Sequence, residues 1–229
     1  MADKAETLRK EYRIRFRDME KYRNDVWKIL CDDYFSRYIA PGDHVLDLGS
    51  GWGEFINNIS AGKKYAMDLN PDTERHLTGG ITFLPQDCSK TWQLPSEILD
   101  VVFTSNFIEH LPDKAHVEQT IREAYRCLKG DGLIMLFGPN IKYSPGAYWD
   151  FWDHFIPLTE LSLCELLKME KFGIQSCIPR FMPYSMSTGS RPPLFFLKMY
   201  LKMPFFWPLF GKQFLVVGKK GGHLPNDKL

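Results

Sequence analysis

The sequence lacks any long uninterrupted hydrophobic run, and its first twenty residues carry charges throughout. A membrane span needs about 20 consecutive apolar residues, and a secretory signal needs an apolar stretch behind its charged start. Because neither pattern is present, we expect a cytoplasmic protein. The chain has 229 residues, of which 44% are hydrophobic. That length allows one domain with one substantial core.

Cysteine is scarce, and its five positions show no CxxC pair and no histidine at metal-ligand spacing. This distribution argues against a disulfide framework and against a zinc site. We therefore interpret the cysteines as reduced residues that mostly pack in the interior: Cys31, Cys88, Cys127, Cys164 and Cys177.

Acidic residues are absent between Glu170 and Asp227, an interval that holds eight basic residues. Part of it, residues 179–212, is too rich in proline for one helix and too apolar for disorder, so we expect a lid or insertion there. Residues 194–210 mix aromatic side chains with lysines. This mixture is typical either of a lid packed on the domain or of an interfacial surface on anionic lipid. The lysines are spaced among bulky apolar residues, so we expect no nucleic-acid binding.

Glycine and proline are also missing from residues 4–38, where apolar residues recur every three or four positions. This spacing predicts a helical lead-in over residues 1–40. Beyond it, in residues 41–229, short apolar runs alternate with helical stretches, which predicts a doubly wound, mainly parallel α/β sheet. We expect strands at 44–48, 64–69, 81–84, 99–104, 133–137, 173–178 and 213–217, and helices at 72–77, 114–128 and 159–171.

Ligands of a parallel sheet bind beyond the carboxyl ends of its strands, and the first expected strand ends in a glycine-rich turn at residues 47–53. Glycines accept positive φ and let the backbone approach a ligand. Their spacing is GxGxG, whereas a dinucleotide site needs GxGxxG. A pyrophosphate cradle is therefore disfavoured.

Polar residues follow the next three strands as well. Asp68 ends one of them, where its carboxylate could accept both hydroxyl protons of a ribose or could cap a helix. Asp87 follows another, where it or the adjacent backbone could bind the amino group of an adenine, or where it could be an ordinary loop residue. After residue 104 the chain changes from apolar to Ser105, Asn106 and then Glu109, as at the mouth of a site.

Four segments then show a resemblance: VLDLGSGWGEF, YAMDLNP, LPQDCS and DVVFTSNFIEHLPD resemble, in order, the motifs of class I S-adenosylmethionine-dependent methyltransferases over about residues 43–138. The resemblance implies S-adenosyl-L-methionine as cofactor and a seven-stranded sheet whose antiparallel last strand is 213–217. Gly49 and Gly51 would flank the methionine part of the cofactor, Asp68 would bind its ribose, and Ser105 with Asn106 would line its sulfonium end. The full implied cofactor set is Asp47, Gly49, Ser50, Gly51, Gly53, Asp68, Leu69, Asp87, Cys88, Ser105 and Asn106.

Residues 148–159 and the insertion before the last strand resemble, more loosely, the small-molecule, type 11/12-like group of the family, which often accompanies bacterial glycan biosynthesis. This implies methyl transfer to a hydroxyl of a sugar or of a lipid- or nucleotide-linked glycan. One alternative is a methyltransferase of a membrane lipid or quinone that contacts the inner membrane surface through residues 194–210. Another is a cofactor-binding protein without transferase activity.

A hydroxyl acceptor needs a base, and two histidines are candidates. His110 follows the fourth strand and is either catalytic or an anchor of its loop. His154 follows the fifth strand, and we expect Asp150 and Asp153 to orient its imidazole. The same three residues could instead hold a divalent metal, but no further carboxylate is near in the sequence, so we expect none.

Overall fold

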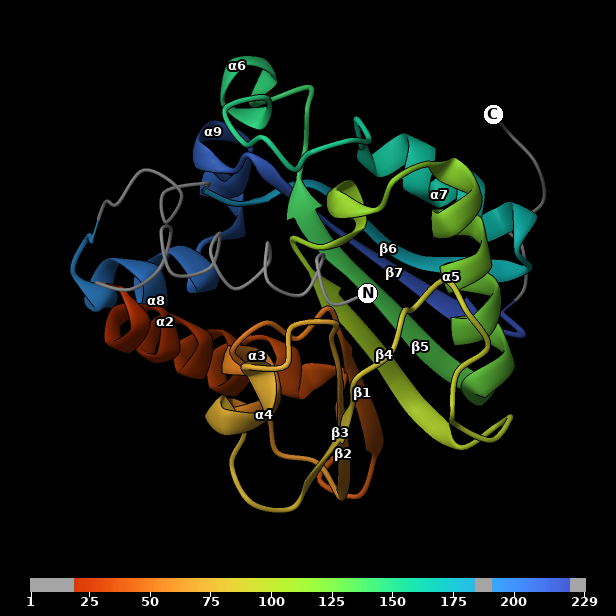
Figure 1. Cartoon of the computed structure of the whole chain (residues 1–229). Coiled ribbons are helices and arrows are strands. Elements are labelled where there is room, and N and C mark those ends of the chain that lie inside the picture. The colour runs from red at the N-terminus through yellow and green to blue at the C-terminus, as the bar shows by residue number, and fades with distance from the viewer. Residues whose placement is uncertain (1–18, 184–190, 223–229) are drawn as a thin grey trace.

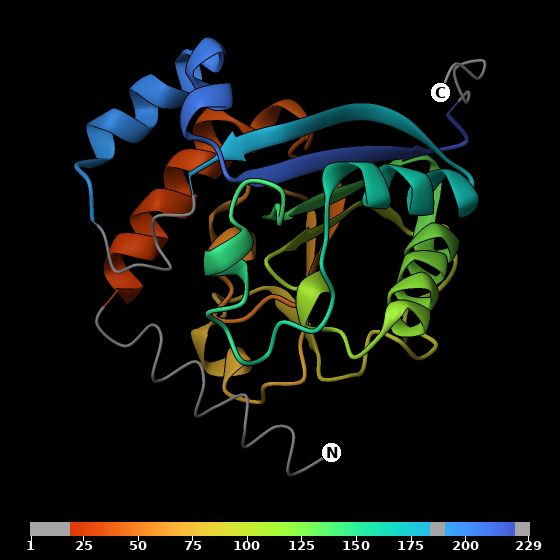
Figure 2. The same cartoon turned by 90° about the horizontal axis from the view of Figure 1, so that it is seen from above.

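The computed structural model describes residues 19–183 and 191–222 as a layered α/β fold built on a seven-stranded sheet (Figures 1 and 2). Residues 1–18 of the expected lead-in lie outside the described residues. The strands are β1 (His44–Leu48), β2 (Lys63–Met67), β3 (Ile81–Leu84), β4 (Leu99–Ser105), β5 (Leu128–Pro139), β6 (Phe172–Met182) and β7 (Gln213–Lys220). The helices are α2 (Glu20–Asp33), η1 (Phe35–Arg37), α3 (Glu54–Asn58), α4 (Thr73–His76), η2 (Ile108–His110), α5 (Lys114–Cys127), α6 (Pro145–Tyr148), α7 (Glu160–Met169), α8 (Leu194–Lys202), η4 (Pro204–Phe206) and α9 (Trp207–Phe210).

The strand order is β3-β2-β1-β4-β5-β7-β6. Strands β1 to β5 pair in parallel, while β7 runs antiparallel to both β5 and β6. This confirms the expected doubly wound sheet with an antiparallel last strand. The direction of winding reverses between β1 and β4, and such a reversal opens a crevice beyond the carboxyl ends of the two strands.

Two hydrophobic cores cover the two faces of the sheet, because the strands are apolar on both sides. On one face, α5 and α7 bury side chains such as Ile121 and Leu167. On the other, α2, α3, α8 and α9 meet in an aromatic cluster around Trp27, where the rings of Phe55 and Phe103 stack with centroids 3.7 Å apart. The face covered by α2 thus also receives the C-terminal helices (Figure 1).

The segment 179–212 is not one separate element. Strand β6 continues to Met182, which pairs with Gln213, so the expected insertion begins inside the sheet. After the residues that the structure leaves undescribed, prolines divide the rest: α8 ends before Pro204, which begins η4, and Pro208 lies in the first turn of α9. Proline fits a first helical turn but not a helix interior, which explains three short helices in place of one.

Arg180 ties these helices to β6. Its guanidinium donates hydrogen bonds to the carbonyl oxygens of Gly211, at 2.7 Å, and Leu209, at 2.9 Å. In the described part of the chain, no helix combines the length and the apolar character that crossing a membrane requires.

Three of the cysteines are buried, as expected, but Cys164 is half-buried and Cys177 is exposed. A hydrogen bond between these two thiols raises the pKa of Cys164 and lowers the pKa of Cys177. Cys164 lies on α7 and Cys177 on β6, and the packing of this helix on the strand, which the cysteine spacing does not show, brings the two thiols together.

Candidate functional site

A cavity of about 230 Å³ opens beyond the carboxyl ends of β1, β2 and β4. It lies at the crevice that the reversal of winding creates. Among the residues expected to bind a cofactor, Gly53 alone is not part of the cavity lining, and both candidate histidines are part of it. The structure therefore brings together residues from four separate sequence segments.

The turn after β1 requires glycine. Gly49 and Gly51 have φ of 70° and 55°, and a Cβ at Gly49 would stand 2.2 Å from the ring of Phe107. The backbone N–H groups of Gly49 and Ser50 donate to the carbonyl oxygen of Met67 in β2, at 2.9 and 3.1 Å. The buried hydroxyl of Ser50 has no hydrogen-bond partner among the described residues. Gly53, with φ of 75°, is the N-cap residue of α3 and lies outside the cavity lining.

Asp68 closes this turn from the end of β2. Its carboxylate accepts hydrogen bonds from the backbone N–H groups of Gly51 and Asn70, both at 2.8 Å. Burial raises the pKa of Asp68 to about 6, although the N–H donors act in the opposite direction. Near neutral pH the carboxylate is therefore ionised and accepts further hydrogen bonds.

Two more carboxylates and one cation lie behind the turn. Asp47 is buried, and its pKa is held well above the ordinary value by burial and by the charges of Glu54 and Asp68. Arg23 of α2 forms an ion pair with Glu54 at 2.7 Å. Sequence reasoning assigned no role to Glu54, although it lies at the end of the glycine-rich motif, and it missed Arg23, because α2 reaches the cavity only through tertiary packing.

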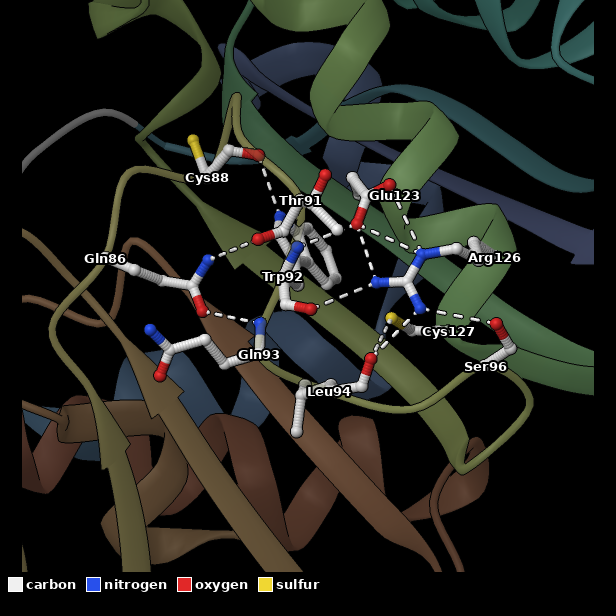
Figure 3. Close-up of polar contacts among 10 residues, drawn as sticks. All are labelled: Gln86, Cys88, Thr91, Trp92, Gln93, Leu94, Ser96, Glu123, Arg126 and Cys127. Atoms are coloured by element: carbon white, nitrogen blue, oxygen red, sulfur yellow. Dashed lines mark hydrogen bonds and ion pairs between the residues drawn. The ribbon is translucent and has the colours of Figure 1, made fainter.

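The loop after β3 brings Asp87 and Cys88 to the cavity, and a polar network holds it there (Figure 3). The carboxylate of Asp87 accepts from the backbone N–H and the hydroxyl of Ser89, at 2.9 and 2.7 Å. The carbonyl oxygen of Cys88 accepts from the indole N–H of Trp92 at 2.7 Å, and the ring of Trp92 is buried beneath the loop.

Arg126 of α5 anchors the same loop from below. Its guanidinium donates to the carbonyl oxygens of Trp92 and Leu94, at 3.2 and 3.0 Å, and pairs with Glu123 at 2.7 Å. Glu123 in turn accepts from the backbone N–H of Trp92 at 2.8 Å. Figure 3 shows these bonds converging on one short stretch of chain.

We expect Arg126→Met to lower the free energy of unfolding by about 1–3 kcal/mol, because it leaves two carbonyl groups and Glu123 without their charged donor. Urea denaturation followed by circular dichroism measures the change. Arg75→Met is the matched control, since Arg75 is exposed and lies 3.7 Å from Asp72. It should change stability by less than about 0.5 kcal/mol. Equal losses in both variants would contradict an anchoring role for Arg126.

Ser105 and Asn106 line the cavity at the end of β4. Asn106 has φ of 48°, in the left-handed region that asparagine tolerates better than most residues. Its amide donates to the hydroxyl of Ser105 at 2.8 Å, and Gln213 donates to its side-chain oxygen at 2.8 Å. Sequence reasoning missed Gln213, although a lone amide at the start of an apolar strand was an available signal.

A second part of the cavity lining lies where η2, which carries His110, contacts the loop 151–156. The backbone N–H groups of Phe155 and Ile156 donate to the carbonyl oxygen of Glu109, at 2.9 and 3.3 Å. His110 contacts Asp153 through Nδ1, which lies 2.9 Å from the backbone oxygen and 3.1 Å from the carboxylate. Both acceptors favour the tautomer with the proton on Nδ1.

His154 is buried beside His110, with the two ring centroids 4.7 Å apart. Phe151 stacks on it at 5.0 Å, and Tyr148 meets it edge-on at 4.8 Å. Of the two aspartates expected to orient His154, Asp153 contacts His110, and Asp150 is exposed and outside the cavity lining.

The carboxyl group of Glu109 faces the same histidines. Glu109 is 1% exposed, and its Oε1 has no hydrogen-bond partner among the described residues. Burial raises its pKa, which the charge of His110 partly opposes. Burial would lower the pKa of His110, but its hydrogen bond to Asp153 and the charges of Glu109 and Asp153 raise it. Glu109 belonged to the expected site mouth without an assigned role.

Comparisons with known proteins identify similar sequences and structures. Residues 46–136 match the family described as "Methyltransferase domain". A relative in Mycobacterium tuberculosis strain H37Rv, named "Probable S-adenosylmethionine-dependent methyltransferase", is 28% identical over 144 residues, which are 61% of this chain and 51% of the relative. A relative of similar name in Mycolicibacterium smegmatis is 28% identical over 156 residues, 62% of this chain and 56% of its own. The chain spans about half the length of the curated relatives it matches.

Solved structures share the fold. A SAM-dependent methyltransferase from Archaeoglobus fulgidus superposes with a TM-score of 0.66 at 23% identity, over 90% of this chain and 99% of that one. The cyclase SpnF superposes with a TM-score of 0.56 at 16% identity, over 82% of this chain and 78% of its own. The same fold is therefore also found in a protein named for another reaction.

The cavity fits S-adenosyl-L-methionine, the cofactor of these relatives. The ionised carboxylate of Asp68 suits the hydroxyls of a ribose, the Gly49 turn leaves room for close backbone approach, and the hydroxyl of Ser50 is free to bond a ligand. The matched family, the curated relatives and the fold agree that residues 46–136 form a methyltransferase domain like that of the class I S-adenosylmethionine-dependent methyltransferases.

Proposed function

We propose that the protein transfers a methyl group from S-adenosylmethionine to a hydroxyl of a small-molecule acceptor, namely a sugar or a lipid- or nucleotide-linked glycan. The observation that carries this proposal is one cavity that joins the Asp68 turn to the paired histidines His110 and His154. When bound, the cofactor supplies a methyl group on a positively charged sulfur, so the carbon–sulfur bond breaks as a carbon–oxygen bond to the acceptor forms.

In this proposal, the residues at the strand ends hold the donor. Asp68 accepts the ribose hydroxyls, and Asp87 with the backbone of Cys88 contacts the adenine. The turn from Gly49 to Gly51, with Asp47 behind it, receives the methionine part. Ser105 and Asn106, fixed by Gln213, line the reacting end. Leu69 and Ser50 are the remaining residues that contact the donor. Gly53 does not contact the donor but caps the start of α3.

The histidine end receives the acceptor. A hydroxyl must lose its proton as it attacks, and an imidazole nitrogen of His154 is placed to take it and pass it to solvent. His110 and Phe151 both contact the ring of His154, and the burial of this ring limits the access of water to it. Asp153 fixes His110 in turn.

Donor binding and methyl transfer test this proposal separately. Calorimetry measures S-adenosylmethionine binding, and a donor with a tritiated methyl group is then offered to sugar nucleotides, lipid-linked glycans and quinols. Label in an ether on a sugar supports the proposal. Donor binding without transfer to any acceptor would instead favour a cofactor-binding protein without transferase activity, an alternative that the fold shared with a cyclase keeps open.

We expect donor affinity to fall as pH falls, because only the ionised form of Asp68 accepts two hydroxyl protons. With a pKa of about 6 in the free protein, the dissociation constant should rise about tenfold between pH 7 and pH 5. Calorimetry at both pH values measures it, with Asp68→Asn as control, which should bind weakly and without this dependence. A flat profile in the unmodified protein would contradict ribose binding by Asp68.

A lipid-linked acceptor is favoured by one surface. Helices α8, η4 and α9 expose Phe195, Phe196, Phe205, Leu209 and Phe210, each more than half exposed, and they lie together at one corner of the molecule (Figure 2). No acidic residue occurs between Glu170 and Asp227 to repel an anionic surface. We propose second that this surface contacts an anionic membrane: the apolar side chains enter the lipid interface, while Lys198 and Lys202 contact the headgroups.

We expect the double variant Phe205→Glu/Phe210→Glu to lose most binding to vesicles of phosphatidylglycerol, measured by sedimentation. The matched control is Leu161→Glu, which changes an exposed apolar residue of α7 and should bind as before. Vesicles of phosphatidylcholine should bind little of any variant, since about 1 kcal/mol for each nearby lysine comes from anionic lipid. Absence of binding by the unmodified protein would contradict membrane contact and leave a soluble acceptor.

A further inference from the structure

Three side chains able to bind a metal converge at the acceptor end of the cavity. One oxygen of Glu109 and one ring nitrogen each of His110 and His154 all lie within 4.8 Å of one another. All three residues line the cavity, two of them on η2 and the third on the loop after α6. The trio differs from the one that the sequence suggested, since it includes Glu109 and omits Asp150 and Asp153.

The contacts of His110 occupy one ring nitrogen and leave the other ring nitrogen for a metal ion. Its Nδ1 is occupied by the carboxylate and the backbone oxygen of Asp153, so Nε2 is the nitrogen available to a cation. Histidines that bind metals usually donate their other ring N–H to a carboxylate or a carbonyl oxygen, which fixes the ring and raises its basicity. His110 has both kinds of acceptor.

Glu109 supplies a second, independent observation. Its side chain is almost completely buried, yet Oε1 has no hydrogen-bond partner among the described residues. A buried carboxyl oxygen is costly unless something pairs with it. The two imidazoles facing it are neutral ligands that, with a carboxylate, make a donor set for a divalent ion.

We propose that Glu109, His110 and His154 bind one divalent transition-metal ion. Two imidazole nitrogens and one carboxylate suit Zn²⁺, Mn²⁺, Fe²⁺ or Co²⁺, whereas Mg²⁺ and Ca²⁺ prefer oxygen ligands alone. Three protein ligands leave coordination positions open toward the cavity, as in catalytic rather than structural sites.

The inference rests on the proposed function and deepens it. A hydroxyl oxygen of the acceptor would occupy an open position, where the cation lowers the pKa of that hydroxyl. The hydroxyl proton then passes to water, and the oxygen forms its bond to the methyl carbon as the carbon–sulfur bond breaks. In this form of the reaction, His154 holds the ion instead of taking the proton.

The test is binding of Co²⁺ alone to untagged protein first freed of metal with a chelator. Co²⁺ held by nitrogen and oxygen ligands gives visible absorption bands, and a titration gives stoichiometry and affinity. We expect one ion per chain. Glu109→Gln and His154→Asn should each weaken binding at least about 100-fold, and Asp153→Asn about 10–100-fold by releasing His110. His76→Asn, a histidine outside the cavity lining, should bind as the unmodified protein does.

Several results would overturn the proposal: no visible bands, weak binding of several ions per chain, or unchanged affinity in Glu109→Gln and His154→Asn. Calorimetry with S-adenosylmethionine on each variant shows that the fold persists. The two proposals fail separately. Methyl transfer that continues in chelator, with no Co²⁺ bound, would refute the metal site alone, whereas one bound Co²⁺ without transfer to any hydroxyl would refute the proposed function alone.

Discussion

Asp68→Ala should weaken the binding of S-adenosylmethionine by about 10²- to 10⁴-fold. Two hydroxyl donors to one carboxylate contribute about 1.5–3 kcal/mol each, and 1.4 kcal/mol corresponds to a factor of ten. The change also removes the acceptor of the Gly51 backbone N–H, so the turn after β1 loses a closing contact. Calorimetry with S-adenosylmethionine and with S-adenosylhomocysteine measures the loss.

The control for this change is Asp72→Ala, which removes a nearby carboxylate outside the cavity lining and should leave affinity within about twofold. Thermal unfolding of both variants separates a loss of affinity from a loss of fold. Affinity in Asp68→Ala equal to that of the unmodified protein would show that the donor does not bind at the end of β2, and the assignment of the whole cofactor set would fall with it.

The donor half of the site was predictable because its geometry follows from local rules. A buried strand that ends in glycines forces a turn, and parallel neighbours place their carboxyl ends at one edge. Gly51 and Asp68 are 17 residues apart in the chain, yet pairing of β1 with β2 puts a backbone N–H of one against the carboxylate of the other. Periodicity and turn chemistry therefore predicted that these segments meet, whereas the cofactor roles of their residues come from the family resemblance and stay predictions.

The acceptor half could not be predicted in the same way. His110 and His154 meet because the loop 151–156 donates two backbone hydrogen bonds to the carbonyl oxygen of Glu109, and nothing periodic in the sequence encodes that contact. Asp153 was expected to orient His154, its sequence neighbour, and its carboxylate also lies 3.1 Å from Nδ1 of His110. Loop geometry, rather than residue type, decides which carboxylate reaches which imidazole.

The structure of the C-terminal segment, residues 179–212, could be predicted only in part. Its proline content correctly predicted that 179–212 is not one helix. Its first residues, up to Met182, instead belong to strand β6, because they pair with the edge of β7. Among its described residues, Pro183 lines the cavity, while α8 packs on α2. A lid over the acceptor thus stays a prediction, and the exposed aromatic side chains point instead to the lipid test.

His154→Asn should lower the rate constant of methyl transfer to a hydroxyl by about 10²- to 10⁴-fold, the usual contribution of a positioned base. Donor affinity should change little, because the carboxylate of Asp68 is held by the backbone N–H groups of Gly51 and Asn70, a turn to which His154 does not belong. Initial rates with saturating S-adenosylmethionine measure the loss, and His76→Asn, outside the cavity lining, is the control that should retain full activity.

The pattern of losses in His154→Asn decides between several roles. Loss of transfer with intact donor affinity assigns His154 to the acceptor, whereas an equal loss of both would mean that the ring only supports the cavity between Tyr148 and Phe151. Comparable rates in the variant and the unmodified protein would contradict a hydroxyl acceptor that needs His154, because a neutral amine attacks the methyl carbon before it loses its proton. The acceptor's own chemistry is therefore readable from one substitution.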